Sequence, residues 1–245
     1  MAPAPKHTHE EELALIVKAA IRCINETSVI DFVMSSLAKE AALSMGSIYK
    51  HIQTKEDVFV VLAIEMYEQL GQVFDKILSL PLPRPVRLIG LHLISEESAS
   101  CFSFGGHLEM LVTNEAVLKR ASTHWVEKMI AAERKLEDSV RAFIEASIAE
   151  NELRVDDKAS ANSVDEILLG IWSMHVGFIQ VARQRHLRFM VGEDEEIPFP
   201  LNVNDPIIQA QKHFLNHFDW REPITDAQII HACDVLAINN LRKEK

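Results

Sequence analysis

The chain has 245 residues, of which 48% are hydrophobic and 25% are charged. These values are ordinary for a soluble globular protein, and the length allows one small domain beside a larger one. The eight glycines and nine prolines do not recur at regular intervals, which argues against a β-sandwich with its frequent turns and favours helices.

The net charge of −11 is unusual for a protein that binds nucleic acid, but the charge is unevenly distributed. Residues 1–55 contain six Lys or Arg and six Asp or Glu, so their net charge is zero and the excess of acid lies in residues 56–245. Within residues 39–55 three lysines stand against Glu40 alone. The sequence therefore favours a locally positive edge on an acidic body, and the acidic body is repelled by phosphates.

The cysteines and the apolar segments indicate the compartment. Cys23, Cys101 and Cys233 are far apart, which favours buried thiols in a reducing cytosol over a disulfide framework. The first twelve residues contain no apolar segment of the kind found in a secretory signal. The strongest apolar run, Val58–Ile64, is too short to span a bilayer. We expect a cytoplasmic protein with no membrane partner.

Hydrophobic residues recur every three or four positions from Glu11 to Glu26, which predicts an amphipathic helix. Two short helices are predicted next, followed by a long helix that begins after Thr54, a typical N-cap, and ends near residue 78 before a proline-rich segment. The segment 191–200 is predicted to be an acidic loop. The predicted short and later helices are 34–41, 45–52, 86–99, 102–112, 115–150, 160–190, 205–218 and 225–242.

The segment 33–52 has the pattern of a helix-turn-helix. Ala38 is small enough for two helices to cross, and Ser44 is a typical N-cap for the second helix. Four apolar residues are spaced to hold the pair on a third helix: Leu37, Ala41, Leu43 and Ile48. The side chains that we expect the second helix to present outward are those of Met45, Gly46, Ser47, Tyr49, Lys50 and His51.

The run from Ser44 to Val58, SMGSIYKHIQTKEDV, resembles the signature of TetR-family transcription regulators. In that signature Ser-x-Gly-Thr/Ser-Leu/Ile-Tyr-x-His/Tyr-Phe leads to Lys-Glu and an apolar residue. The detailed resemblance covers about residues 12–58, and the remainder resembles the family only in length and helical character. It implies an all-α fold with an N-terminal helix-turn-helix domain over residues 1–55. The larger helical domain, 56–245, is expected to sense a ligand and to dimerise.

The resemblance also implies roles for individual residues. Tyr49, His51 and Lys55 match positions that contact the DNA backbone, where a phenol, an imidazole and an ammonium group donate hydrogen bonds to phosphate or add positive charge. Four further side chains lie where base edges are within reach, Gly46 permits close approach of the backbone, and Ser44 orients the second helix. The four are Ser35, Met45, Ser47 and Lys50.

Four positions depart from the family pattern. Val33 stands where Ser or Thr usually caps the first helix of the pair, and Met45 replaces a common lysine. Ala42 replaces the usual turn glycine, which disfavours a left-handed backbone there, and Ile52 replaces the usual phenylalanine. These departures leave open an alternative function, a helical interaction protein in which DNA binding is degenerate.

Two sets of residues in the larger domain have both a structural and a functional interpretation. In TetR-like proteins late helices form the dimer interface, so the resemblance favours a homodimer through small and apolar residues of helix 160–190 over packing within the chain. These residues are Ile167, Gly170, Ile171, Met174, Gly177, Phe178 and Val181. A second set belongs either to the core or to an apolar ligand pocket: Phe102, Phe104, His107, Met110, Trp125, Met129, Trp172 and His175.

The function predicted is that of a sequence-specific regulator of transcription, a repressor released by a small, largely apolar ligand. A homodimer is expected to bind a palindromic operator in double-stranded DNA. An enzyme is not indicated, because nucleotide-binding glycine motifs, a nucleophile elbow and paired cysteines are all missing. No cofactor or metal site is expected either, since His213 and His217 lack the glutamate that a zinc hydrolase has after its first histidine.

Overall fold

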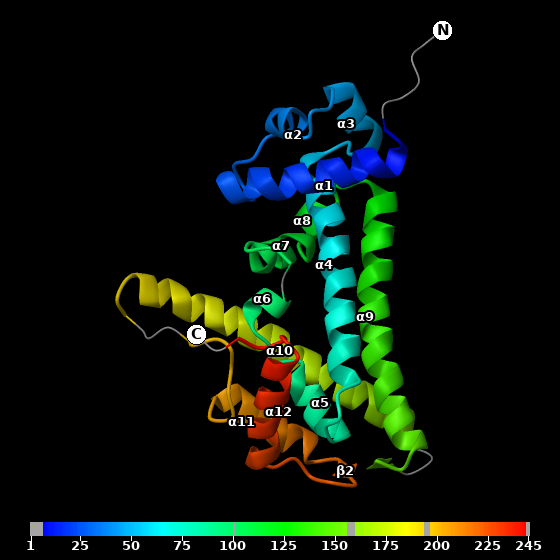
Figure 1. The fold of residues 1–245 in the computed structure, drawn as a ribbon, viewed down its shortest axis with the longest axis vertical. Coiled ribbons are helices and arrows are strands. Elements are labelled where there is room, and N and C mark those ends of the chain that lie inside the picture. The colour runs from blue at the N-terminus through cyan, green and yellow to red at the C-terminus, as the bar shows by residue number, and fades with distance from the viewer. Residues whose placement is uncertain (1–6, 100, 156–159, 194–196, 244–245) are drawn as a thin grey trace. The chain divides into compact units, whose positions relative to one another are not determined.

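A computed structural model describes residues 7–99, 101–155, 160–193 and 197–243 (Figure 1). The first six residues of the predicted N-terminal domain and the middle of the predicted acidic loop, 194–196, lie outside the described residues. Within the described ranges the chain forms twelve helices and one pair of two-residue strands. The predicted all-α class is confirmed.

The three predicted N-terminal helices are present as α1 (His9–Glu26), α2 (Met34–Glu40) and α3 (Met45–His51). A capping box opens α1, because Thr8 Oγ1 accepts from the Glu11 amide and the Glu11 carboxylate accepts from the Thr8 amide. Ser44 Oγ caps α3 by accepting from the Ser47 amide at 3.0 Å. Val33 at the start of α2 makes no such bond, as its side chain has no acceptor.

The turn between α2 and α3 is a Schellman motif closed by two bonds, from the Leu43 amide to Ala38 O at 3.0 Å and from the Ala42 amide to Lys39 O at 3.1 Å. Ala42 has φ of 53°, so the turn adopts the left-handed conformation that we expected alanine to disfavour. Packing of Ala38 and Ala41 in the core holds the turn in this geometry. An alanine held there costs roughly 1–2 kcal/mol relative to a right-handed residue.

Contacts divide the chain into two compact units. Unit 1 consists of the described parts of residues 1–70 and 100–135, and unit 2 consists of those of 71–99 and 136–245. Two long helices, α4 (Lys55–Leu78) and α9 (Thr123–Ala149), contribute residues to both units. The units therefore do not follow one cut along the chain, and the division after residue 55 stays a prediction about function.

Several predicted helices after α4 are shorter or divided. The predicted helix 86–99 is α5 (Arg84–Gly90) and α6 (Glu96–Ala99), and the predicted helix 102–112 begins late as α7 (Gly105–Val112). The predicted helix 115–150 is divided into α8 (Glu115–Leu118) and α9. The break before α9 has a physical reason: the Ser122 amide donates to the Asp57 carboxylate at 2.6 Å and is therefore taken out of the helical hydrogen-bond ladder.

Unit 1 has a continuous apolar core beneath the helix-turn-helix. Ile16 and Ala20 of α1 pack with Leu37 of α2 and Ile48 of α3, and Ile52 joins them with no exposed surface. Figure 1 shows α2 and α3 beside α1 at the end of unit 1 where α4 begins. The further core residues come from α4, α7 and α9: Val58, Val60, Leu62, Leu108, Val112 and Met129.

Unit 2 is built around α10 (Ser160–Met190), the 31-residue helix predicted over residues 160–190. It contacts α11 (Pro206–Leu215), which in turn contacts α5, and α12 (Asp226–Ile238) also packs on α5. The strands β1 (Leu153–Arg154) and β2 (Asp219–Trp220) pair antiparallel. Two residues are too few to give an alternating pattern, so the sequence did not indicate these strands. The cysteines are free thiols, of which Cys23 is buried.

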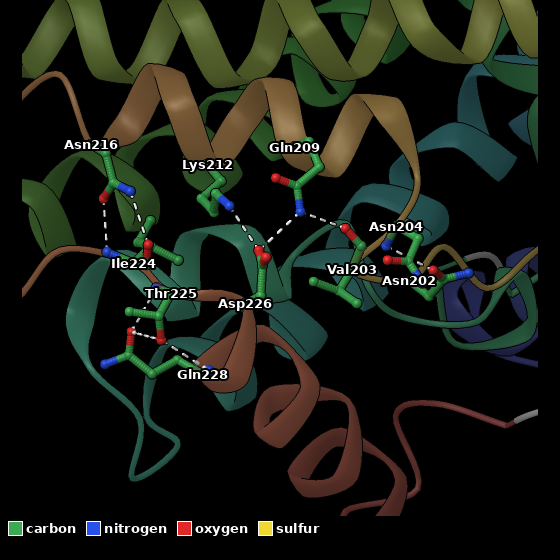
Figure 2. Close-up of polar contacts among 10 residues, drawn as sticks. All are labelled: Asn202, Val203, Asn204, Gln209, Lys212, Asn216, Ile224, Thr225, Asp226 and Gln228. Atoms are coloured by element: carbon green, nitrogen blue, oxygen red, sulfur yellow. Dashed lines mark hydrogen bonds and ion pairs between the residues drawn. The ribbon is translucent and has the colours of Figure 1, made fainter.

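Polar contacts hold the start of α12 on α11 (Figure 2). Asp226 Oδ1 accepts from Lys212 Nζ at 2.7 Å and from Gln209 Nε2 at 3.0 Å, and these bonds lower the pKa of the Asp226 carboxyl. The Asn216 side chain both donates to Ile224 O and accepts from the Ile224 amide, which fixes the connection between the helices. A capping box of Thr225 and Gln228 then opens α12.

The left-handed residue at Ala42 gives a direct test of the turn. Replacement by glycine, Ala42→Gly, removes the steric cost of φ 53° and should stabilise the protein by about 1 kcal/mol, seen as a higher Tm in thermal unfolding. As a matched control, Ala131→Gly at an exposed position inside α9 should destabilise by about 1 kcal/mol, since glycine is a poor helix former. A lower Tm for Ala42→Gly contradicts the proposed strain.

Candidate nucleic-acid interface

The surface formed by α2, the turn and α3 carries most of the predicted DNA-contacting residues. Tyr49 and Met45 are exposed to 48% and 36%, which leaves a phenol and a thioether accessible on the outer face of α3. Of the remaining residues of the set, His51 is buried and Ser47 and Lys55 are half-buried, with Ser47 Oγ 3.2 Å from Ser44 Oγ, and the others are exposed. The exposed ones are Ser35, Ser44, Gly46 and Lys50.

His51 does not point outward, contrary to the prediction. Its side chain is only 1% exposed, and Nε2 lies 2.8 Å from Glu12 Oε2. The ring of His9 covers it, with the ring centroids 4.1 Å apart. The hydrogen bond to His51 lowers the pKa of the Glu12 carboxyl. His51 therefore joins the last turn of α3 to the first turn of α1, because the helical rotation at its position turns the ring towards the core.

Lys55 is also engaged within the protein. Its Nζ donates to Ile30 O and lies 4.6 Å from the centroid of the Phe32 ring. A cation over an aromatic face is attracted by the ring, so the contact holds the α1–α2 connection against the start of α4. The predicted contact between Lys55 and phosphate competes with these bonds, and we assign the residue a supporting position.

The interface carries less negative charge than the composition of the whole chain suggests. Glu40, which is the only acid in the segment 39–55, pairs with Arg22 of α1. Lys39 and Lys50 are both exposed on the same pair of helices. The positive charge of these lysines is therefore not opposed by a free carboxylate on that segment, and the surface can attract phosphate.

The eight predicted ligand-pocket residues do not form one cluster. Phe102, Phe104, Trp125 and Met129 are buried in the core of unit 1, where the rings of Phe102 and Phe104 stack with centroids 5.1 Å apart. His107 and Met110 are exposed on α7, whereas Trp172 and His175 belong to α10 of unit 2. A lining shared by all eight residues stays a prediction, because they are divided between unit 1 and unit 2.

A pair of histidines in unit 2 was missed by the sequence analysis. The rings of His92 and His175 lie with their centroids 4.8 Å apart, and His92 Nδ1 is buried without a hydrogen-bond partner among the described residues. Burial, followed by the neighbouring His175, lowers the pKa of His92 well below its usual range. Burial and the charge of Arg183 lower the pKa of His175. His92 follows α5 in a turn, where no periodicity could indicate its partner.

The predicted dimer residues of α10 are divided between the core and the surface. Ile167 and Ile171 are buried in unit 2, and Phe178 packs against this core beside Phe199. A Cβ atom on Gly170 would lie 2.2 Å from the Phe214 ring, so this glycine serves the packing of α10 on α11. These four residues therefore serve packing within unit 2, and their assignment to a dimer interface stays a prediction. Val181 and Gly177 are exposed, and Met174 is half-buried.

The exposed face of α10 consists of other apolar residues of the same helix. Leu169, Trp172 and Val176 are exposed at three- and four-residue spacing, so they lie on one face. By length and composition alone, residues Asn162–Met190 are also apolar enough to cross a membrane, and they are the only such helix within the described ranges. An exposed apolar face of this kind is typical of an interaction surface.

No protein-family model and no curated protein matches the chain. Solved structures do match its fold. A protein of unknown function from Rhodococcus sp. RHA1 has a TM-score of 0.57 at 14% identity, covering 89% of this chain and 99% of that one. RolR in complex with its ligand resorcinol has a TM-score of 0.53 at 15% identity, covering 93% of both chains. AmtR of Mycobacterium smegmatis has a TM-score of 0.50 at 18% identity and full coverage of both chains.

AmtR and RolR are TetR-family regulators, in which a helix-turn-helix precedes a helical regulatory domain. The chain therefore has the TetR-family fold, as the resemblance of residues 44–58 predicted. At these identities the likeness concerns the fold, and the residues of the interface rest on the geometry above.

The two histidines predict how stability depends on pH. A histidine whose pKa is lowered by folding is protonated more readily when unfolded, so stability is full above the ordinary value of about 6.5 and falls below it. Between pH 7 and pH 5 the loss should reach at most about 1.4 kcal/mol per pH unit for each histidine. Denaturant unfolding of His92→Gln should show a flatter pH dependence, whereas His213→Gln on the exposed face of α11 should match the wild type.

Proposed function

We propose that this chain, which has the TetR-family fold, is a TetR-type regulator of transcription that binds duplex DNA through α2 and α3. The observation that carries the proposal is the exposed outer face of α3, which presents Met45, Tyr49 and Lys50 while Ile48 is buried beneath them. A short capped helix that is anchored on one face and polar on the other fits the major groove. The signature at residues 44–58 supports the same function.

The geometry supports a smaller set of DNA contacts than the resemblance alone. Tyr49 and Lys50 are placed to reach phosphates from the exposed face of α3. Ser35, Met45 and Ser47 are proposed for base edges, with the Met45 thioether offering an apolar contact to a thymine methyl group. His51 and Lys55 support α3 and α4 from within the unit.

We propose a homodimer that forms through Leu169, Trp172 and Val176 on the outer face of α10. One seven-residue recognition helix reads too few base pairs to select a site, so two copies must reach successive major grooves about 34 Å apart. A two-fold dimer requires an operator that is close to palindromic. The exposed apolar residues of α10 provide the dry contact that such an interface needs.

A small effector is proposed to control DNA binding, most simply by releasing a cytoplasmic repressor. RolR, which shares the fold, was solved with resorcinol, a small aromatic ligand. In this chain the buried His92 Nδ1, beside the ring of His175, is a nitrogen that can bind a polar group of such a ligand. The effector must favour the arrangement that does not bind DNA, with a coupling of typically ~1–3 kcal/mol. No enzymatic activity is proposed.

DNA binding is tested with the full-length protein and duplexes selected by it from a random-sequence library. Lys50→Ala should weaken binding and flatten the slope of log affinity against log salt by about 1.8, since the dimer loses two phosphate contacts at about 0.9 each. Lys119→Ala removes an equally exposed lysine from α8's C-terminal end, outside the helix-turn-helix, and should leave both quantities unchanged. A wild-type chain without salt-sensitive DNA affinity would indicate the helical interaction protein instead.

The dimer is tested by placing a charge on the outer face of α10. Leu169 is 63% exposed, so Leu169→Glu should fold normally but desolvate a carboxylate at the interface. Sedimentation at micromolar concentration should then show a monomer, with DNA affinity reduced at least about tenfold. Ile230→Glu on α12, a residue 52% exposed, is the matched control and should remain dimeric. Dimers of both variants would place the interface elsewhere.

A further inference from the structure

The last residue of the recognition helix is held from two sides. On one side its side chain binds Glu12 of α1, and on the other the Trp125 indole Nε1 donates to its backbone, His51 O, at 3.0 Å. The last carbonyls of a helix have no partner within the helix. Trp125, in the first turn of α9 and only 5% exposed, thus supplies one of the missing donors to α3.

A buried carboxylate holds the connection between α3 and α4. Asp57 is completely buried, and its oxygens accept from the amides of Gln53 at 2.8 Å and Thr54 at 3.1 Å. The same carboxylate accepts from the Ser122 amide at 2.6 Å and from Ser122 Oγ at 2.8 Å. We call Gln53, Thr54, Asp57 and Ser122 the Asp57 cluster. It joins the residue before α9 to the two residues before α4.

We infer that the start of α9 positions the recognition helix, with Trp125 and Ser122 as positioning residues. This inference rests on the proposed function, because it concerns how α3 is presented to DNA. The two contacts lie on either side of the residues that link α3 to α4, so these residues are fixed relative to the first turn of α9. All of the groups involved belong to unit 1.

The chemistry of these contacts makes them sensitive to small movements. A hydrogen bond weakens steeply when the donor moves beyond about 3.2 Å or out of line. His51 and Asp57 are buried, so the His51 carbonyl would lose the Trp125 donor and the Asp57 carboxylate would lose its two Ser122 donors without gaining water. If α9 shifts along its axis by about one ångström, these hydrogen bonds either break or carry α3 along with α9. Moving α3 costs less free energy than leaving the buried acceptors without donors.

The inference gives α9 a part in regulation beside that of α4. α9 is one continuous helix from Thr123 to Ala149, and its residues from 136 onward belong to unit 2. α4 is linked covalently to the helix-turn-helix, whereas the start of α9 reaches α3 through the Trp125 bond to His51 O and reaches Asp57 of α4 through the two bonds of Ser122. An effector that displaces α9 therefore acts on the recognition helix directly.

The test compares two tryptophans in matched environments. Trp125 and Trp220 are each 5% exposed, and each donates its indole N–H to a backbone carbonyl, at 3.0 Å and 2.9 Å respectively. Trp125→Phe and Trp220→Phe therefore remove the same bond and similar volume, one at the recognition helix and one in unit 2. Ser122→Ala removes only the hydroxyl bond to Asp57 and is the milder variant of the same contact.

Each full-length variant is titrated with the duplex that the wild type selects, and with duplexes in which the half-sites are moved apart or together by one base pair. Trp125→Phe should bind the selected duplex about tenfold more weakly and discriminate less between spacings, since α3 is no longer held in one position. Ser122→Ala should lower the affinity for the selected duplex and the discrimination between spacings, each by about threefold. Trp220→Phe should bind and discriminate as the wild type does.

Equal losses in Trp125→Phe and Trp220→Phe would reduce the effect to general destabilisation, and unchanged spacing preference in Trp125→Phe would overturn the inference. Hydrogen exchange of the free protein gives a readout that does not need DNA. Amides of residues 48–54 should exchange at least about tenfold faster in Trp125→Phe and at the wild-type rate in Trp220→Phe. If the wild type binds no DNA, the proposed function fails, while this exchange experiment still decides whether α9 holds α3.

Discussion

The structure of unit 1 depends on the buried carboxylate of Asp57. An ionised group without water is stable only when hydrogen bonds satisfy its oxygens. The four donors to Asp57 come from residues 53–54 and from Ser122, which are far apart in sequence. The residues that precede α4 and the segment that precedes α9 therefore satisfy the same buried carboxylate. One side chain thus couples the proposed DNA-binding helices to a helix of the regulatory part.

This constraint separates residues that support the interface from residues that form it. His51 and Lys55 carry groups suited to phosphate, yet both are bound to neighbours within unit 1. Tyr49 and Lys50, two positions and one position before His51, remain exposed. A helix of seven residues has little stability of its own, so some of its polar side chains must bind neighbouring helices to hold it in place. The side chains of α3 that remain exposed then determine which contacts the helix can make in the proposed complex with DNA.

The sequence predicted α1 to α4 well because local signals, periodicity and capping residues such as Ser44 and Thr54, determine them. It did not predict the break before α9, which depends on a hydrogen bond between Ser122 and the distant Asp57. The sequence could not separate the core face of α10 from its exposed face, because apolar residues occur on all its sides and Ile171 in the core looks like Trp172 outside. The sequence also could not predict that His92 lies beside His175, because only folding brings these two distant residues together.

If the proposed function holds, the same arrangement accounts for selective binding of DNA by an acidic protein with a short recognition helix. With few positive charges near α3, non-specific attraction to phosphate is weak, and more of the affinity must come from groups in defined positions. Defined positions require a rigid support, which the cores of α1 and α4 provide on one side and Trp125 provides on the other. Because part of that support belongs to α9, the position of α3 cannot be independent of the state of that helix. Specificity and regulation then use the same few buried hydrogen bonds.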